Sequence, residues 1–493
     1  MGNRSFLAFD IGAESGRAVV GEICNKKLNV REVYRFSNGM IKDRGHLHWD
    51  MGNIFNEVRK GIREGNRQAE RSIGSLGIDT WGVDFGLVDR EGVLLSHPFA
   101  YRDSRNEAAM KDFLAIMSEQ RIYDLTGIQF LQFNSVFQLY AHRIFNPDLL
   151  ERAHKLLFIP DILNYFLTDQ QFTEFTFATT SQMYNPAAGD WEGEIFENVG
   201  ITSDIMLEIV QPGTFVGRIK SSEQEKTGLG DVSVLAVATH DTGSAVAAVP
   251  AEDGNWAFIS SGTWSIMGVE TENPVICEKT RELNFTNEGG LDNTFRLCKN
   301  IAGLWLLQEC RRFWAKDKAY SYADLAHMAQ AAAPFKCFVD PDWPGFLNPE
   351  EMTEAISRYC RLTHQPLPES RGEIVRCILE SLAFKYRYVL DELREVSDKP
   401  IEKIHIIGGG GKNSLLCQFT AEATGLPVFS GPIEATAVGN LMVQARFSGE
   451  VKDWEEMRRI ISRSFDIEEY RPKTGELWDN VYSRFRGILS DNC

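Results

Sequence analysis

Short apolar stretches recur along the chain, and several of them end in small or polar residues. Residues 6–20 are interrupted by two glycines, which predicts two strands joined by a tight turn. Residues 73–82 and 234–241 each predict a strand that stops at a polar break. Between them, residues 53–70 predict a charged amphipathic helix. This alternation of strands and helices predicts an α/β protein.

The second half of the chain repeats this order. Residues 256–269 predict another strand, turn and strand, with Ser, Gly and Thr at the turn, and residues 404–413 predict a strand that ends in four glycines. Residues 371–395 predict a long helix with an apolar stripe packed in the core. The matching order predicts two related α/β domains, residues 1–250 and 251–493, that face each other across a cleft.

Composition narrows the class of protein. A chain of 493 residues with 43% hydrophobic and 25% charged residues is typical of a globular protein of about two to three domains. Its 52 basic and 69 acidic residues give a net charge of −17, which argues against a broad nucleic-acid surface. It does not argue against a phosphorylated small molecule, because such a site needs only local donors.

The sequence predicts a cytoplasmic protein without a membrane segment. The apolar stretch after Met1 is too short and too quickly acidic for a signal peptide, and no apolar run has membrane-spanning length. Nine cysteines without a CxxC pair indicate neither a zinc site nor a disulfide framework. Cys360 and Cys377 could meet if two helices pack, and reduced core thiols are expected there.

Asp241 stands where a buried strand opens into a Gly/Ser turn. Ligands meet α/β sheets at the carboxyl ends of their strands. We therefore interpret Asp241 as the catalytic base of a sugar kinase. The alternative is that Asp241 only caps the helix that follows.

The first predicted hairpin has the composition of a phosphate site. Gly12 and Gly16 allow close backbone approach, while Ser15 and Arg17 add donors. Asp10, just before the turn, is placed to hold Mg²⁺ directly or through water. The alternative is a Gly-rich hairpin with a solvent-facing arginine.

Two further stretches suggest ligand contacts. Trp81 and Asp84 could form a platform for a sugar, although a tryptophan in an apolar stretch is more often part of the core. The glycines of residues 408–411 suit a nucleotide lying over the backbone, or a flexible connection. They are not a Walker A loop, because Asn413 follows Lys412 where Ser or Thr is needed. Together with Asp10 and Asp241, these stretches supply the parts that phosphoryl transfer needs.

The longer motifs resemble the FGGY carbohydrate kinases of the actin/hexokinase/Hsp70-like superfamily, and the resemblance covers nearly the whole chain. Within that family they are most similar to the kinases that phosphorylate L-rhamnulose. The motifs are Ala13–Arg17, Gly77–Phe85, Ala100–Arg105, Ser260–Trp264, Lys299–Asn300 with Gly303–Gln308, and His405–Gly410. The resemblance implies two actin-like (ribonuclease H-like) domains with mixed sheets flanked by helices, the N-terminal one for the sugar and the C-terminal one for the nucleotide.

The resemblance also implies roles for individual residues. Asp241 would take the proton from the 1-hydroxyl of L-rhamnulose, with ATP as phosphoryl donor, Mg²⁺ as required ion, and L-rhamnulose 1-phosphate and ADP as products. ATP would be bound by Ala13, Glu14, Ser15, Gly16, Arg17, Thr263, Gln308 and Gly409, and the sugar by Gly82, His240, Asp241, Thr242 and Asn300. Glu14 departs from the family pattern, because many relatives have a small hydroxyl residue at this position. A carboxylate near phosphates is repulsive unless it faces solvent or a metal.

Two other functions remain open at this point. One is a kinase of the same fold for another ketose such as L-fuculose, because one or two hydroxyl positions decide that choice. The other is a non-catalytic regulator that binds a sugar or nucleotide, although such a protein needs no base. In each case the expected partners are small molecules, and the chain is expected to be a monomer or a small homo-oligomer.

Overall fold

The computed structural model describes residues 4–251, 253–473 and 475–490. The chain forms two compact units, each assembled from separate segments. The first contains the residues up to Pro250, Glu270–Leu297 and Ala435–Ser464, and the second contains Ala251–Val269, Cys298–Glu434 and the residues from Phe465 onward. The chain therefore leaves the first unit and returns to it twice.

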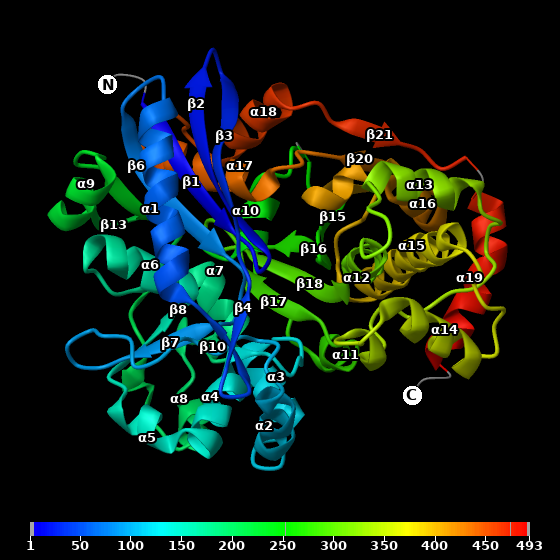
Figure 1. Ribbon diagram of the computed structural model, residues 1–493, viewed down its shortest axis with the longest axis horizontal. Helices are drawn as coiled ribbons and strands as arrows, with labels where there is room; N and C mark the ends of the chain where they lie inside the picture. Colours follow the sequence, from blue (N-terminus) through cyan, green and yellow to red (C-terminus); the bar gives the residue numbers. More distant parts are fainter. Residues whose placement is uncertain (1–3, 252, 474, 491–493) are drawn as a thin grey trace. The chain divides into compact units, whose positions relative to one another are not determined.

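The first unit contains most of the strands and many short helices (Figure 1). Its strands are β1 (Ser5–Ile11), β2 (Ser15–Cys24), β3 (Lys27–Ser37), β4 (Met40–Asp43), β5 (His46–Trp49), β6 (Ile73–Thr80), β7 (Phe85–Val88), β8 (Lys155–Phe158), β9 (Thr173–Glu174), β10 (Tyr184–Asn185), β11 (Asp190–Trp191), β12 (Ile209–Val210), β13 (Thr214–Arg218), β14 (Ser233–Ala236) and β17 (Thr286–Gly289). Its helices are α1 (Met51–Gln68), α2 (Arg105–Leu114), α3 (Glu119–Thr126), α4 (Ser135–Phe145), α5 (Pro147–Arg152), α6 (Ile159–Thr168), α7 (Phe175–Ala178), α8 (Gly193–Val199), α9 (Ser221–Thr227), α10 (Asp241–Ala247), α11 (Glu278–Glu282), α17 (Ala435–Phe447) and α18 (Trp454–Ser464), with the 3-10 turns η1 (Thr179–Ser181) and η2 (Ser203–Ile205).

The main sheet of this unit has six strands in the order β13-β14-β6-β1-β2-β3. Strand β1 is antiparallel to β2 and parallel to β6, and β6 is parallel to β14. Every residue of β1 is buried, as expected for a central strand covered on both faces. The predicted strands at residues 6–20 and 73–82 are therefore confirmed, and the sheet is mixed.

Helices α1 and α17 cover opposite faces of this sheet. Side chains alternate along a strand, so Leu7 and Phe9 of β1 face α1, where a Cβ on Gly61 would lie 2.5 Å from Phe9 Cε1. Helix α17 instead approaches the face that carries Ala8 and its register partner Gly77. The face of Ala8 also carries Asp10, so α17 packs on the side of the sheet that presents this carboxylate.

The second unit contains a smaller set of elements. Its strands are β15 (Trp256–Ser261), β16 (Trp264–Thr271), β18 (Phe295–Ala302), β19 (Lys403–Ile407), β20 (Val428–Ser430) and β21 (Glu468–Tyr470), and the limits of the unit fall within β16 and β18. Its helices are α12 (Trp305–Trp314), α13 (Tyr322–Ala331), α14 (Met352–Leu362), α15 (Arg371–Val396), α16 (Ser414–Thr424) and α19 (Gly475–Ser490), with the 3-10 turns η3 (Pro344–Phe346) and η4 (Gly409–Lys412).

The second sheet repeats the plan of the first. Its order is β17-β18-β16-β15-β19-β20-β21, in which β15 is antiparallel to β16 and parallel to β19. Strand β15 thus corresponds to β1, β16 to β2, β19 to β6 and β20 to β14. In both sheets the last of these strands pairs with an antiparallel edge strand, β13 or β21. The prediction of two related α/β folds with mixed sheets is confirmed.

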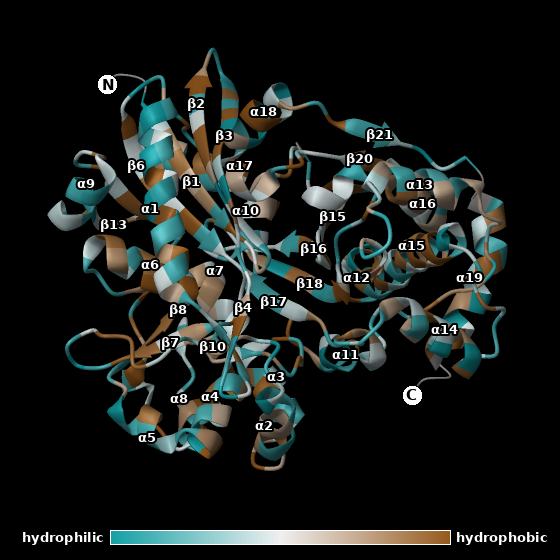
Figure 2. Ribbon diagram, viewed as in Figure 1, coloured by the Kyte–Doolittle hydropathy of each residue, from teal (hydrophilic) through white to brown (hydrophobic). Residues whose placement is uncertain are grey.

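Helix α15 is the core helix predicted from its apolar stripe. Figure 2 shows the apolar bands along this helix, and Ile378, Leu382, Tyr386 and Leu390 are all buried. Cys360 and Cys377, near its N-terminal half, are also buried and have free thiols. Among the residues with described placement, no helix is both long enough and apolar enough to cross a bilayer.

Candidate functional site

Three carboxylates lie at the carboxyl ends of neighbouring parallel strands of the first unit. Asp10 in β1 is the register partner of Asp79 in β6. His240, beyond the end of β14, bridges in parallel with Thr80, and Asp241 follows as the first residue of α10. This edge is where open α/β sheets bind their ligands. The expected place of Asp241 at the end of a strand agrees with the structure.

These carboxylates affect one another electrostatically. Burial away from water raises the pKa of Asp79 well above its ordinary value, and the nearby charge of Asp10 raises it further. Asp79 Oδ2 accepts a hydrogen bond of 2.6 Å from Asn440 Nδ2 in α17. Desolvation also raises the pKa of Asp241. The electrostatic effect of His240 lowers this pKa, and the charge of Asp10 raises it. A base with a raised pKa is a stronger proton acceptor.

Asp241 is accessible and does not cap α10. His240 occupies the N-cap position, and Asp241 is the first helical residue, so the capping interpretation of Asp241 is wrong. Thr242 Oγ1 donates to Asp241 Oδ1 at 3.1 Å, and His240 Nε2 lies 3.4 Å from the same oxygen. The Asp241 side chain is 32% exposed. It can therefore meet a ligand while its neighbours orient it.

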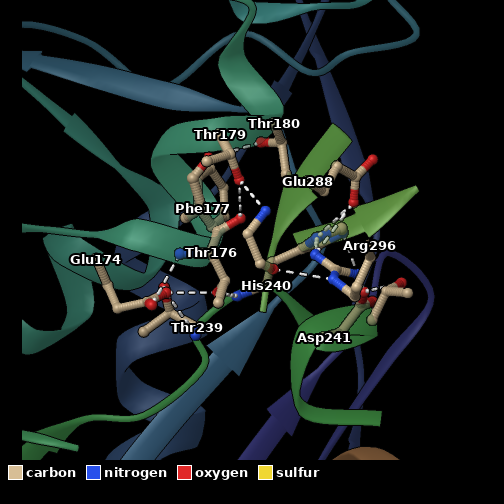
Figure 3. Close-up of polar contacts among 12 residues, drawn as sticks. Glu174, Thr176, Phe177, Thr179, Thr180, Thr239, His240, Asp241, Glu288 and Arg296 are labelled. Carbon is tan, nitrogen blue, oxygen red and sulfur yellow. Dashed lines mark hydrogen bonds and ion pairs between the residues drawn. The ribbon is translucent and has the colours of Figure 1, made fainter. Parts of the chain in front are cut away.

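A buried glutamate anchors the turn that carries His240. Glu174 Oε2 accepts hydrogen bonds from Thr239 N at 2.9 Å and from Thr239 Oγ1 at 2.8 Å. The same oxygen accepts one of 2.6 Å from Thr176 Oγ1, and Glu174 Oε1 accepts one of 2.8 Å from Thr176 N. Thr176 Oγ1 in turn accepts from His240 N at 3.2 Å. Figure 3 shows this network beside the turn, which it holds from the side of α7.

The imidazole of His240 is held by a second buried group. Arg296 Nη2 lies 3.3 Å from His240 Nδ1, and Glu288 Oε2 lies 3.3 Å from the same nitrogen (Figure 3). On the other edge of the ring, a Cβ on Gly82 would lie 3.3 Å from His240 Nε2. A glycine at this position therefore leaves space next to Nε2.

The predicted phosphate hairpin is formed between β1 and β2. Gly12 N donates to Ser15 O at 2.9 Å, which closes the turn around Ala13 and Glu14. Glu14 and Ser15 are exposed, and contact with solvent weakens the repulsion between a carboxylate and a phosphate. Arg17 is paired with Asp10, with Nη2 2.5 Å from Oδ2, rather than extending into solvent.

The remaining candidates lie in the second unit. Thr263 lies at the tip of the β15–β16 hairpin, where its carbonyl accepts hydrogen bonds from Gly303 N at 3.1 Å and Trp305 N at 3.2 Å, at the start of α12. Gln308 lies one turn along α12, and its buried Oε1 meets no hydrogen-bond partner in the described part of the chain. Gly409 opens η4, where a Cβ would have no neighbour within 4 Å.

Gly409, Gly410 and Gly411 lie in the 3-10 turn η4 with Gly408 at its N-cap, so the four glycines are part of a defined structure and not a flexible connection. A Cβ on Gly410 would lie 2.0 Å from Ser261 Oγ, so this turn packs directly on the end of β15. Asn300 is half-buried in β18 of the same sheet. The glycine turn thus packs on the strand that leads to Thr263, and the carbonyl of Thr263 contacts the start of α12, the helix that carries Gln308.

Trp81 and Asp84 do not form a sugar platform. Both are buried, with Asp84 fully so. Asp84 Oδ2 accepts hydrogen bonds from the indole nitrogens of Trp49 at 2.6 Å and Trp81 at 3.0 Å, and Gln138 Nε2 donates to Oδ1 at 2.8 Å. The alternative, that a tryptophan in an apolar stretch is more often part of the core, is correct.

Four residues of this site have no role in the sequence analysis: Asp79, Glu174, Glu288 and Arg296. The available signal in the sequence is a charged residue inside a predicted strand, as with Asp79 in residues 73–82. Nothing in the local sequence indicates that Arg296 meets His240, which is 56 positions away. Across residues 4–251, 253–473 and 475–490, no three His, Cys, Asp or Glu side chains are grouped as a metal site.

Comparisons with known proteins agree with this architecture. Residues 5–248 match the N-terminal domain of the FGGY family of carbohydrate kinases, and residues 257–447 match its C-terminal domain. The chain is 48% identical to a rhamnulokinase of Bacteroides thetaiotaomicron over 99% of both chains. It is 42% identical to a rhamnulokinase of Halalkalibacterium halodurans over 94% of this chain and 98% of that protein.

Solved structures show the same fold at lower identity. A gluconate kinase and a xylulose kinase, both from Lactobacillus acidophilus, each superpose with a TM-score of 0.81 at 17% identity, over 99% of this chain and 98% of theirs. Such identities support the fold alone. Both family domains and the full-length relatives lead to one conclusion: the chain belongs to the FGGY family of carbohydrate kinases.

Proposed function

We propose that this protein transfers the γ-phosphoryl group of ATP to the 1-hydroxyl of L-rhamnulose, giving L-rhamnulose 1-phosphate and ADP. The observation that carries the proposal is the 48% identity with a rhamnulokinase over 99% of both chains. The position of Asp241 at the carboxyl edge of the first sheet, with an accessible carboxylate, supports it. The reaction would serve the breakdown of L-rhamnose in the cytoplasm.

In this reaction Asp241 is the proton acceptor. The oxygen of the 1-hydroxyl forms a bond to the γ-phosphorus, the bond from that phosphorus to the β,γ-bridging oxygen breaks, and the hydroxyl proton passes to Asp241. Proton transfer of this kind contributes about 10²–10⁴-fold to the rate. His240 and Thr242 contact Asp241, and Gly82 lies beside the His240 ring. These three residues would orient the sugar, and Asn300 would complete the sugar contacts.

The nucleotide contacts follow the two hairpins and the glycine turn. Ala13 to Arg17 would direct backbone N–H groups and the Arg17 guanidinium toward the phosphates. Thr263, Gln308 and Gly409 would contact the nucleotide, for which the open space at Gly409 is suited. Residues 1–250 would thus supply most of the sugar and phosphate contacts, and residues 251–493 most of the nucleotide contacts.

Asp10 would hold Mg²⁺, directly or through water. The donor set fits this ion: Asp10 lies next to Asp79, whose buried Oδ1 meets no hydrogen-bond partner among the described residues. Mg²⁺ at kinase sites is commonly bound by one or two carboxylates, water and substrate phosphates. When bound, the ion would neutralise charge on the phosphates.

The decisive experiment is ADP release from Mg·ATP with L-rhamnulose, L-fuculose, L-xylulose, L-ribulose, D-xylulose and glycerol. The largest kcat/KM is expected with L-rhamnulose. If L-fuculose gives the largest kcat/KM, the proposed mechanism stands and L-fuculose replaces L-rhamnulose as the assigned substrate. No turnover in a folded sample that binds ATP would contradict the kinase and favour a non-catalytic regulator. Sedimentation in the same buffer tests the expected monomer or small homo-oligomer.

A further inference from the structure

A fully buried arginine is directed at the ring of His240. Arg296 lies in β18 with 0% of its surface exposed, and its Nε donates to Gly289 O at 2.9 Å. Its Nη2 approaches His240 Nδ1 to 3.3 Å in hydrogen-bond geometry, as Figure 3 shows. Burying a guanidinium in this way costs several kcal/mol of folding free energy unless the charge is paired. The groups that contact Arg296 therefore decide whether the protein can hold this charge in its core.

The chemistry of the guanidinium limits the protonation of the imidazole. Arginine has five N–H donors, no acceptor, and a charge that it keeps at all ordinary pH values. His240 Nδ1 can accept a hydrogen bond from Arg296 only through its lone pair. The single proton of a neutral ring must then be on Nε2.

Glu288 allows the opposite arrangement, in which Nδ1–H donates to its carboxylate. Its Oε2 lies 3.3 Å from His240 Nδ1, but it accepts no hydrogen bond with acceptable geometry in the described part of the chain. The same oxygen lies 3.2 Å from Arg296 Nη2. At this ion-pair distance the Glu288 carboxylate balances the charge of Arg296.

The outer edge of the ring agrees with a proton on Nε2. His240 Nε2 lies 3.4 Å from Asp241 Oδ1, and a carboxylate oxygen is complementary to an N–H group, not to a lone pair. The neighbouring Gly82 leaves space beside Nε2 for a ligand oxygen. Both ring nitrogens thus have a complementary partner in only one neutral tautomer.

We propose that Arg296 is a positioning residue that holds His240 as the neutral tautomer with its proton on Nε2, and that Glu288 balances the guanidinium charge. This role rests on the proposed function. In that reaction Nε2–H donates to Asp241 or to a sugar oxygen, and it has no lone pair with which to take the hydroxyl proton. The tautomer therefore leaves Asp241 as the proton acceptor.

The tautomer can be read directly from the unmodified enzyme. Protein labelled with ¹⁵N-histidine gives ring-nitrogen signals for its nine histidines, and His240→Gln identifies those of His240 by their loss. The expected spectrum at pH 8 has an unprotonated Nδ1 and a protonated Nε2. A protonated Nδ1, alone or together with Nε2, would overturn the proposal. This spectrum requires no substitution at Arg296 and no turnover.

A double variant tests the cause. Arg296→Met with Glu288→Met removes the ion pair as a unit, so that no single buried charge is left unpaired. Protonation of Nδ1 should appear, and kcat with the sugar should fall about tenfold to a hundredfold, as for partners that orient ligand histidines. The KM for ATP should stay within about twofold. Unchanged ring-nitrogen signals would overturn the proposal.

The matched control is a second arginine–glutamate pair of the same unit. Arg59 Nε lies 2.6 Å from Glu223 Oε2, and the Glu223 side chain is only 2% exposed. Arg59→Met with Glu223→Met should leave the His240 signals and kcat unchanged. An equal change in the two double variants would overturn the specific role of Arg296. If the Arg296 variant does not fold, the wild-type spectrum decides. A wild type without turnover would contradict the proposed function, while its spectrum still decides the tautomer.

Discussion

Asp10 and Arg17 are register partners on β1 and β2, and their side chains form an ion pair with 2.5 Å between Oδ2 and Nη2. The pair lies beside the turn that is expected to bind phosphates. Asp10 is also the register partner of Asp79 on the other side. One carboxylate thus lies between a cation and a second acid, so its charge affects both neighbours.

Asp10→Asn should weaken the use of Mg²⁺. The amide keeps an oxygen that can accept from Arg17 but loses the negative charge that attracts the ion. We expect the Mg²⁺ concentration at half-maximal rate to rise about tenfold, equivalent to about 1.4 kcal/mol. Calorimetry of Mg·ADP binding gives a readout without turnover. Asp112→Asn, at an exposed position of α2, is the control. An unchanged Mg²⁺ requirement in Asp10→Asn would argue against Asp10 as the residue that holds the ion.

Asp241→Asn should abolish phosphoryl transfer and keep ligand binding. The amide retains the shape of the side chain and an oxygen for Thr242 Oγ1, but it cannot accept the proton. We expect kcat to fall by about 10²–10⁴-fold, while calorimetry detects sugar and ATP at near wild-type affinity. Loss of sugar binding by this variant would indicate a mainly structural Asp241. The exposed Asp231→Asn serves as control.

Asp84 should make stability depend on pH. Burial raises its pKa from 3.8 to about 6, although three side chains and a backbone N–H donate to it. Because the folded pKa is the higher one, its contribution is complete below pH 3.8 and is lost as the pH rises through 6. The loss is about 3 kcal/mol, from about 1.4 kcal/mol per pKa unit.

Urea unfolding of wild type and Asp84→Asn between pH 4 and 7.5 measures this loss. Asparagine does not titrate, so the wild type should lose stability relative to the variant as the pH rises. Asp89→Asn, in an exposed turn where the side-chain oxygen still accepts from Val93 N, should follow the wild-type curve. Parallel curves for wild type and Asp84→Asn would contradict the raised pKa.

Gly439→Ala should disturb the helix that begins with Asp241. A Cβ on Gly439 of α17 would lie 1.8 Å from Ser244 O in α10, so the two helices must separate. Overpacking of this kind costs about 1–3 kcal/mol, and the shift of α10 should lower kcat. Urea unfolding and ADP release measure both effects. Gly39→Ala is the control, because a Cβ at that position meets nothing within 4 Å. Equal stability of Gly39→Ala and Gly439→Ala would contradict this packing constraint.

Local patterns were sufficient for much of the fold. The apolar stretch at residues 6–20, the helix at 371–395 and the glycine turn at 408–411 all have the expected type of structure, because alternation, helical periodicity and glycine act within a few residues. Trp81 and Asp84 were harder to interpret. A polar residue next to a tryptophan has the same local signature at a pocket and in a core, and only the contacts of Asp84 with Trp49 and Gln138 decide between them.

By itself, the sequence determined the class of fold, its repetition in two halves, and a carboxylate at the end of a strand. Those properties depend on side-chain periodicity and on turns, which are local. Only the tertiary structure decided that Asp79 lies next to Asp10, that Glu174 holds the turn before His240, and that Arg296 meets the imidazole. Such contacts join residues tens of positions apart, and their strength depends on burial and on the mutual distance of charges, which no short stretch of sequence contains.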